Sequence, residues 1–128
     1  MATTWRWLDL GAVDGATMVN VFVALARPVA EGRSPPTAFV LYPERPFANV
    51  GFHQEAEREV DIPYCRANGI PVVRRVVGGG AILDGPWEHD YMVVVPPGAP
   101  DELPDPPMGG PIADSVSGML WLRRTSTT

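Results

Sequence analysis

Near the N-terminus, the spacing of hydrophobic and polar residues changes from a strand-like alternation to a run typical of a helix. Residues 5–8 alternate aromatic or apolar side chains with charged ones, which predicts a short strand that ends at Gly11. The apolar run 15–27 follows Asp14, a residue type that caps helices, and precedes Pro28, which stops them. This run predicts a largely buried helix, and its β-branched residues leave a strand as the alternative.

The middle of the chain predicts a hairpin and a helical stretch. Residues 37–42 and 47–52 are strand-like, and the turn "PERP" between them predicts that they pair with each other. Residues 53–69 are helical in character. Asp61 is the expected N-cap, Pro63 is tolerated in the first turn, and Gly69 ends the helix. Three more strands are predicted at 70–75, 81–83 and 89–95, so the fold class is α+β with a mixed or antiparallel sheet and flanking helices.

The C-terminal part has a different composition. Residues 96–111 contain seven prolines and three glycines, which predicts a loop or linker over 97–111. Residues 112–124 have the spacing of an amphipathic helix, although Gly118 weakens it by about 1 kcal/mol relative to alanine. We therefore divide the chain into residues 1–96, the linker 97–111 and a helical segment with a tail, 112–128.

Composition limits the function classes. A chain of 128 residues with a net charge of −5 has the size of one domain and lacks the basic surface that nucleic-acid binding requires. Its single cysteine, the lack of a leader sequence and apolar runs too short for a bilayer predict a cytoplasmic protein that does not span a membrane. All ten basic residues are arginine, so the sequence contains no lysine.

The stretch "RRVVGGGAIL" carries the candidate chemistry. Consecutive glycines let a ligand approach main-chain N–H groups, and the preceding Arg74 and Arg75 add positive charge, so the pattern suits a phosphate or carboxylate. Strand alternation predicts that one arginine binds this anion while the other is solvated or paired. The spacing matches neither a Walker loop nor a Rossmann loop, and an ordinary flexible turn is the plain alternative.

The same stretch resembles the signature of the lipoate-protein ligase family, an arginine pair followed by three glycines and an apolar segment. The segments "WRWLDLG", "DGAT", "PVAEGRSPPT", "FANVGFHQEAEREVD" and "ANGIPVVRR" stand in the family's order, so the resemblance covers most of residues 5–96. It implies a biotin and lipoate ligase-like fold, related to class II aminoacyl-tRNA synthetases, of which this chain holds an incomplete N-terminal portion.

The resemblance also implies an activity. Family members use ATP and Mg²⁺ to convert lipoate to lipoyl-adenylate, and then transfer the lipoyl group to a lysine of a lipoyl-carrier domain. The implied substrate- and nucleotide-binding residues are Arg75, Gly78, Gly79, Gly80, Ala81, Ile82 and Leu83, with Arg74, Gln54 and Asp84 as weaker candidates. No catalytic residue is assigned, because the family's activating lysine has no counterpart in this chain.

Three residues or segments depart from the family pattern, and the first two named below touch this stretch. Val77 stands where the family has serine or threonine, Asp84-Gly85 stands where a His-Asp pair is frequent, and Phe22-Val23-Ala24 stands where "DEA" is usual. They fit either a divergent subgroup or relaxed constraint on a fragment. Three functions stay open: a ligase completed by a second subunit, a non-catalytic acyl- or nucleotide-binding module, and an octanoyl or lipoyl acyltransferase.

Other reactive side chains are better explained structurally. Cys65 suggests the thioester nucleophile of an acyltransferase, but its helical surroundings predict a buried structural thiol. No metal site is predicted, because His53 and His89 lack ligand spacing and solvated acids explain Asp84, Glu88 and Asp90 better than a Mg²⁺ site does. The tryptophans are expected in the core or at its rim.

Overall fold

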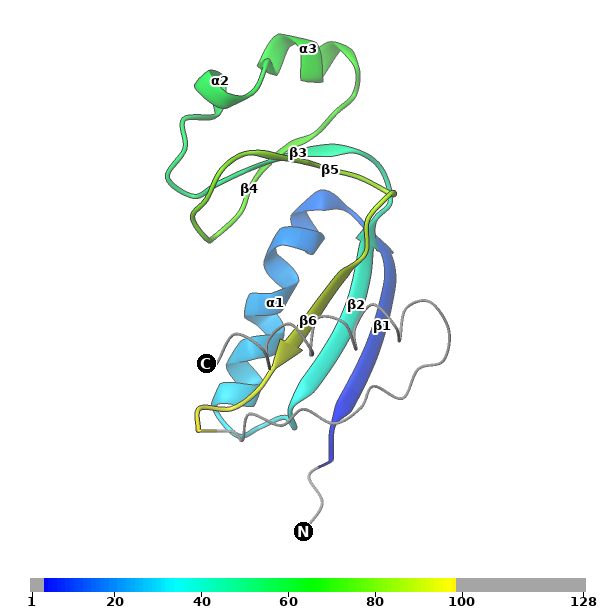
Figure 1. The fold of residues 1–128 in the computed structure, drawn as a ribbon, viewed down its shortest axis with the longest axis vertical. Coiled ribbons are helices and arrows are strands. Elements are labelled where there is room, and N and C mark those ends of the chain that lie inside the picture. Colours follow the sequence, from blue (N-terminus) through cyan, green and yellow to red (C-terminus); the bar gives the residue numbers. More distant parts are fainter. Residues whose placement is uncertain (1–3, 99–128) are drawn as a thin grey trace, which may run out of the picture. The chain divides into compact units, whose positions relative to one another are not determined.

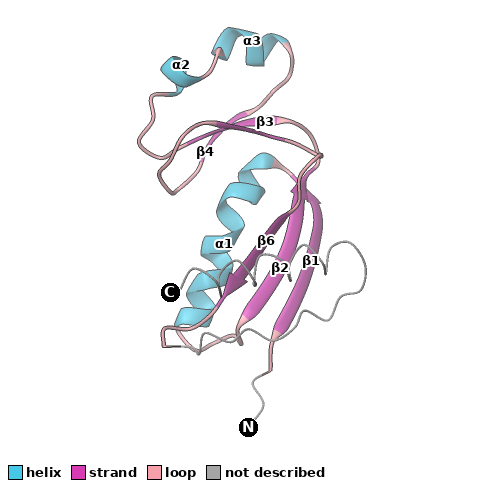
Figure 2. Cartoon of the chain, in the orientation of Figure 1, coloured by secondary structure: helices cyan, strands magenta, loops and turns pink. Residues whose placement is uncertain are grey.

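Two three-stranded mixed sheets and a long helix make up most of the structure, a computed structural model that describes residues 4–98. In chain order the elements are β1 (Arg6–Val13), α1 (Gly15–Ala30), β2 (Thr37–Pro43), β3 (Phe47–Val50), α2 (Ala56–Glu59), α3 (Ile62–Ala67), β4 (Val72–Arg74), β5 (Ile82–Asp84) and β6 (Asp90–Val94) (Figure 1). Figure 2 shows the same chain coloured by helix and strand. The predicted α+β class is confirmed.

The first sheet has the order β1-β2-β6 and carries the main core. Strand β2 pairs in parallel with β1 and antiparallel with β6, so both of its edges are occupied. Helix α1 packs against this sheet, and Phe39 and Leu41 of β2 are fully buried against Met18 and Val19 of the helix. Burial of such apolar side chains stabilises the unit by about 25 cal/mol per Å².

The second sheet has the order β4-β3-β5 and positions the candidate site. Strand β3 is its centre, parallel to β4 and antiparallel to β5, and all four of its residues are buried. The loops that leave its ends are therefore anchored by a rigid central strand.

The predicted hairpin between residues 37–42 and 47–52 is wrong. Strands β2 and β3 belong to different sheets, because each already has two other strands on its edges. The second strand ends at Val50 rather than at residue 52, since the chain turns at Gly51.

Two of the predicted element ends are also wrong. Strand β1 continues to Val13, because Gly11 forms a bulge with a φ of 64° that shifts the register without breaking the pairing. Helix α1 continues past Pro28 to Ala30, since the proline lies in the last turn, where a missing N–H affects only one bond. The residues 15–27 are helical rather than extended.

Helix α1 is less buried than the sequence predicts. Only Met18, Val19 and Val29 are buried, and the Val23 side chain is 40% exposed. The helix contacts β2 and β6 of the first sheet and β3 and β4 of the second, and the apolar side chains on its outer face remain accessible.

The local signals at helix starts are confirmed. Asp14 accepts a 2.8 Å hydrogen bond from the Thr17 N–H at the start of α1, and Asp61 accepts one of 2.9 Å from the Tyr64 N–H at the start of α3. Cys65 is buried, as predicted, at 7% exposure.

Part of the sequence prediction falls elsewhere in the chain. Apart from Pro97 and Gly98, the predicted linker 97–111 and the segment 112–128 lie outside the described residues. Within the residues that are described, no helix is both long and apolar enough to cross a membrane.

Candidate functional site

The loop that connects β4 to β5 brings the three consecutive glycines to the surface. Gly78, Gly79 and Gly80 are all exposed, and Gly79 has a φ of 113°, a conformation that other residues rarely adopt. No acceptor among residues 4–98 receives a hydrogen bond from the main-chain N–H groups of these three glycines. These three donors have no partner among the described residues, and anion binding by the loop stays a prediction.

A second loop, residues 51–54, packs directly beneath the glycine loop. The Phe52 N–H donates a 3.0 Å hydrogen bond to the Val77 carbonyl, and the Gly51 N–H donates one of 2.7 Å to Gln54 Oε1. A Cβ on residue 51 would overlap the Gly79 carbonyl oxygen and lie 3.0 Å from its carbon. Gly51 is thus required for the contact between the loops, which we call the two-loop site (residues 51–54 and 75–81).

The sequence did not single out Gly51 or the position of His53. The only signal for Gly51 is a glycine directly after a short apolar strand, and close backbone approach is one reason for that pattern. The Cδ2 atom of His53 lies 3.9 Å from the point where a Cβ of residue 78 would stand. His53 therefore borders the glycine loop, a role that its lack of metal-ligand spacing did not suggest.

Arg75 holds the glycine loop rather than extending away from it. Its Nη2 donates to the Gly78 carbonyl at 3.0 Å and to the Gly80 carbonyl at 2.8 Å, and its Nε donates to Gly78 at 3.2 Å. Its Nη1 donates to Asn49 Oδ1 at 3.1 Å and to the Asn49 carbonyl at 3.4 Å. These five bonds equal the five N–H groups of a guanidinium, so Arg75 orders the loop in this conformation.

Arg74 is also bonded to main-chain oxygen atoms. Its Nη1 donates to the carbonyls of Gly51 at 3.0 Å and Phe52 at 3.2 Å, and to that of Gln54. The sequence prediction of one anion-binding arginine and one solvated or paired arginine is therefore incomplete, because both guanidinium groups fix the two-loop site from within. Direct binding of a ligand by Arg75 stays a prediction.

Apolar side chains surround the two-loop site. Ala81 is exposed, and Ile82 and Leu83 of β5 are 52% and 58% exposed. Phe52, Val76 and Val77 of the two-loop site, and Trp87 after β5, are also large exposed apolar side chains. Exposed apolar clusters of this kind mark surfaces that bind a ligand or another polypeptide segment. The prediction that residues 81–83 border a ligand is compatible with this exposure.

Asp84 lies at the other end of β5 and is not solvated. It is 7% exposed, and its Oδ2 accepts a 2.7 Å hydrogen bond from the Nδ2 of the buried Asn49. Every buried side-chain nitrogen or oxygen of the described residues has such a partner. The interpretation of the acids at 84–90 as solvated is therefore wrong for Asp84, because the central strand β3 covers it.

Glu88 and Asp90 share this partly buried environment. Burial, and then the negative charge of Asp84 and a hydrogen bond with it, raise the pKa of Glu88 to about 7. Burial and Asp84 also raise the pKa of Asp90. No group of three or more His, Cys, Asp or Glu side chains that could hold a metal ion occurs among the described residues.

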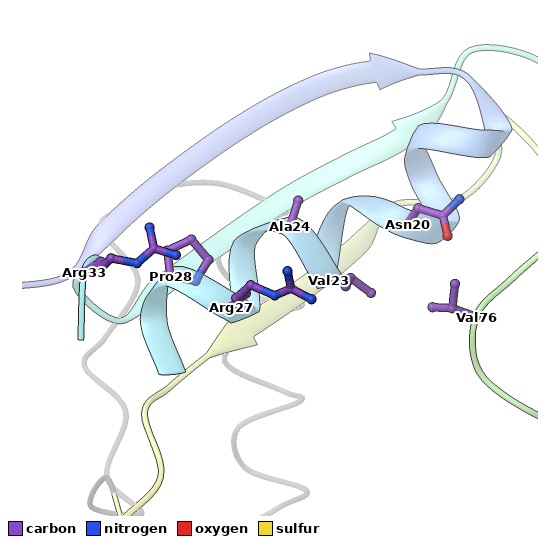
Figure 3. A pocket seen from close by; sticks show the side chains of 7 residues that line it. All are labelled: Asn20, Val23, Ala24, Arg27, Pro28, Arg33 and Val76. Carbon is purple, nitrogen blue, oxygen red and sulfur yellow. The ribbon is translucent and has the colours of Figure 1, made fainter. Parts of the chain in front are cut away.

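A groove of about 390 Å³ runs along the outer side of α1. Figure 3 shows Asn20, Val23, Ala24 and Arg27 along the helix, with Val76 opposite them. Because Val76 belongs to the two-loop site, the groove extends from that site along the helix. Its middle is apolar, and Arg27 and Arg33 lie toward its far end.

Comparison with known protein families shows which family this chain belongs to. The family described as the lipoyl protein ligase A/B catalytic domain matches residues 16–104, which contain both loops and the two arginines. The chain belongs to this family. The resemblance recognised in "RRVVGGGAIL" is thereby confirmed, and the family's enzymes transfer or ligate lipoyl and octanoyl groups.

Curated proteins similar to this chain include octanoyltransferases. The chain is 36% identical over 93 residues to octanoyltransferase LipM of Moorella thermoacetica, covering 73% of this chain and 34% of that protein. It is 38% identical over 99 residues to octanoyltransferase LipM of Exiguobacterium sp., covering 77% and 35%. The chain thus spans about a third of the length of the curated relatives it matches.

Similar solved structures are lipoate-protein ligases. One is a lipoate-protein ligase A bound with ATP, with a TM-score of 0.59 and 26% identity over 73% of this chain and 36% of that one. Another is a putative lipoate protein ligase from T. acidophilum with bound lipoic acid, with the same TM-score and identity over 73% and 37%. A third is a bi-partite ligase studied with its lipoyl domain, at a TM-score of 0.55 and 25% identity over 72% and 36%. These likenesses confirm the predicted ligase-like fold.

Proposed function

We propose that this chain forms the acyl-binding part of an octanoyl- or lipoyl-transferring enzyme. The observation that carries the proposal is the set of unused N–H groups at Gly78, Gly79 and Gly80, beside the exposed apolar side chains of Ile82 and Leu83. Such a surface suits a ligand with a carbonyl or anionic head and a medium-length apolar tail. An octanoyl group has this shape, and octanoyltransferases are among the most similar curated relatives.

The glycine loop would act on the acyl carbonyl. When the amine of a carrier lysine attacks a thioester, the carbonyl oxygen gains negative charge before the C–S bond breaks. The new C–N bond then remains, and the departing thiolate takes a proton from the amine. Main-chain N–H groups held in place by Arg75 would stabilise that oxyanion. Loss of one such donor typically lowers kcat by about 100- to 1,000-fold.

The nucleophile of any covalent step would come from outside the described residues. Cys65, the one cysteine of the chain, is 7% exposed and lies in α3, apart from the two-loop site. The chain would therefore work with further polypeptide, either in the same protein or as the second part of a bi-partite enzyme, and a lipoyl-carrier domain would accept the acyl group.

ATP-dependent activation is the second candidate. The likeness to a lipoate-protein ligase bound with ATP favours it, since the glycine loop also suits a phosphate. In that case ATP, Mg²⁺ and lipoate would be substrates, and lipoyl-adenylate would be the intermediate. For this activity, the lysine that contacts carboxylate and phosphate in the family would have to lie outside these 128 residues, since none of them is a lysine.

Calorimetric titration of the 128-residue chain separates these candidates. We expect octanoate and lipoate to bind and ATP with Mg²⁺ not to bind. In Leu83→Asp, a charge in the apolar surface should weaken octanoate binding about tenfold, the equivalent of roughly half of a buried leucine side chain. Tyr64→Asp on α3 is the matched control, because Tyr64 is equally exposed at 59%.

Each other outcome has a clear meaning. Binding of ATP alone would favour the ligase reaction over acyl transfer. Binding of none of these compounds, or an equal loss in the Leu83 and Tyr64 variants, would refute an acyl site at the two-loop site.

A further inference from the structure

Asn49 joins three strands of the second sheet through its side chain. It lies in the central strand β3, where it is 7% exposed. Its Oδ1 accepts from Arg75, which follows β4, and its Nδ2 donates to Asp84 in β5. One buried amide therefore connects the arginine of the glycine loop with the acidic turn.

The two bonds require opposite hydrogen-bonding groups. Arg75 offers only donors, and the Asp84 carboxylate offers only acceptors. An amide presents an acceptor to the first and a donor to the second, and its dipole then lies along the line from cation to anion. A leucine of similar size would leave both charged groups without this partner, and an aspartate would place two carboxylates against each other.

The pairing register explains why these residues meet. Asn49 lies opposite Ile82, and Phe47 lies opposite Asp84, so Asn49 and Asp84 are diagonal neighbours on one face of the sheet. Asp84 is also one of the positions where this chain departs from the family pattern.

We propose that Asn49 is the positioning residue of the glycine loop: it bridges Arg75 and Asp84, and so fixes the guanidinium where it binds the carbonyls of Gly78 and Gly80. The consequence for the acyl site rests on the function proposed above. In a trans peptide the N–H of one residue points opposite to the carbonyl of the residue before it, so holding the Gly78 and Gly80 carbonyls toward Arg75 turns the N–H groups of Gly79 and Ala81 away from the guanidinium. Outside its own loop, the Arg75 guanidinium bonds to Asn49 alone among the described residues, through the Oδ1 atom and the main-chain carbonyl.

A swap of the two side chains tests this assignment. In Asn49→Asp, two buried carboxylates face each other at the place of a 2.7 Å hydrogen bond. In the double variant Asn49→Asp with Asp84→Asn, the carboxylate accepts from Arg75 and from the new amide, so the network is restored. Asn68→Asp on the exposed end of α3 controls for the added charge.

Two measurements are made on each full-length variant. The ¹⁵N–¹H resonance of Arg75 Nε reports its environment without any ligand, and Arg74 serves as the internal reference. Calorimetry with octanoate reports the acyl site. We expect Asn49→Asp to shift the Arg75 resonance and weaken octanoate binding about tenfold, as for loss of one charged hydrogen bond. The double variant and Asn68→Asp should match the wild type in both measurements.

The results separate this proposal from the proposed function. A double variant as perturbed as Asn49→Asp overturns the positioning role, even where Asn49→Asp alone does not fold. A lower denaturation midpoint with an unchanged Arg75 resonance also overturns it. If the Arg75 resonance responds as expected while the wild type binds no octanoate, the positioning role holds and the acyl function fails.

Discussion

The substitution Gly51→Ala tests whether close packing of the two loops builds the site. The added Cβ would overlap the Gly79 carbonyl oxygen, and it would stand 3.3 Å from Gln54 Oε1. A main-chain atom cannot rotate away as a side chain can, so the glycine loop must move. Overpacking of this kind costs about 1–3 kcal/mol.

The displacement has a second cost. A loop that moves away from Gly51 weakens the bonds from Arg75 to the Gly78 and Gly80 carbonyls, and each hydrogen bond to a charged group contributes about 1.5–3 kcal/mol. Since the loop can shift without losing both bonds, we expect a total near 2 kcal/mol. For a unit of this size, such a loss lowers the melting temperature by about 10 °C.

Urea and thermal denaturation measure this loss, and Gly80→Ala is the matched control. Residue 80 belongs to the same loop, its φ is not in the left-handed region, and a Cβ there meets nothing within 4 Å. We expect Gly80→Ala to change the free energy of unfolding by less than about 0.5 kcal/mol. Equal stability of Gly51→Ala and Gly80→Ala would refute the close packing of the two loops.

Two further substitutions test the electrostatics of the fold. Because the folded-state pKa of Glu88 is raised to about 7 from 4.5, the folded protein keeps a proton that the unfolded chain loses, and stability should fall as the pH rises between these values. Glu88→Gln should remove this loss, so at pH 8 the variant should be more stable than the wild type by about 1 kcal/mol, a figure reduced for solvent screening. At pH 4 the two proteins should be equally stable. The same difference at both pH values in urea denaturation would contradict this expectation. Asp14→Ala should lower the melting temperature at pH 7, because Asp14 caps α1 and the hydrogen bond from the Thr17 N–H lowers its pKa. The difference should shrink as the pH falls below 3.8, where the carboxylate becomes protonated, and Glu44→Ala, an exposed acid outside the helix, should show no comparable change.

The sequence predicted much of the site but placed its parts differently. The motif "RRVVGGGAIL" predicted an exposed loop with accessible N–H groups, and the family resemblance drawn from it is confirmed. The motif alone does not distinguish ATP-dependent ligation from acyl transfer. A glycine loop that binds a phosphate can also bind an acyl oxyanion, so the octanoyltransferase relatives shift the preferred function from ATP-dependent ligation to acyl transfer.

Features fixed by neighbouring residues followed from the sequence alone. The caps at Asp14 and Asp61 and the positive φ of Gly79 depend on side chains or hydrogen atoms within a few residues, so composition and spacing determine them. The burial of Cys65 followed in the same way from its place in a short helix.

Features that join distant segments were decided by the tertiary structure. The pairing of β2 and β3 in separate sheets depends on which strands occupy their edges, and the hairpin turn between them carries no such information. Gly51 meets Gly79 and Asn49 meets Asp84 only because β3 lies at the centre of the second sheet. The sequence alone determined that a glycine loop with two arginines would be present, and the packing of β3 decided that both arginines hold the loop from within.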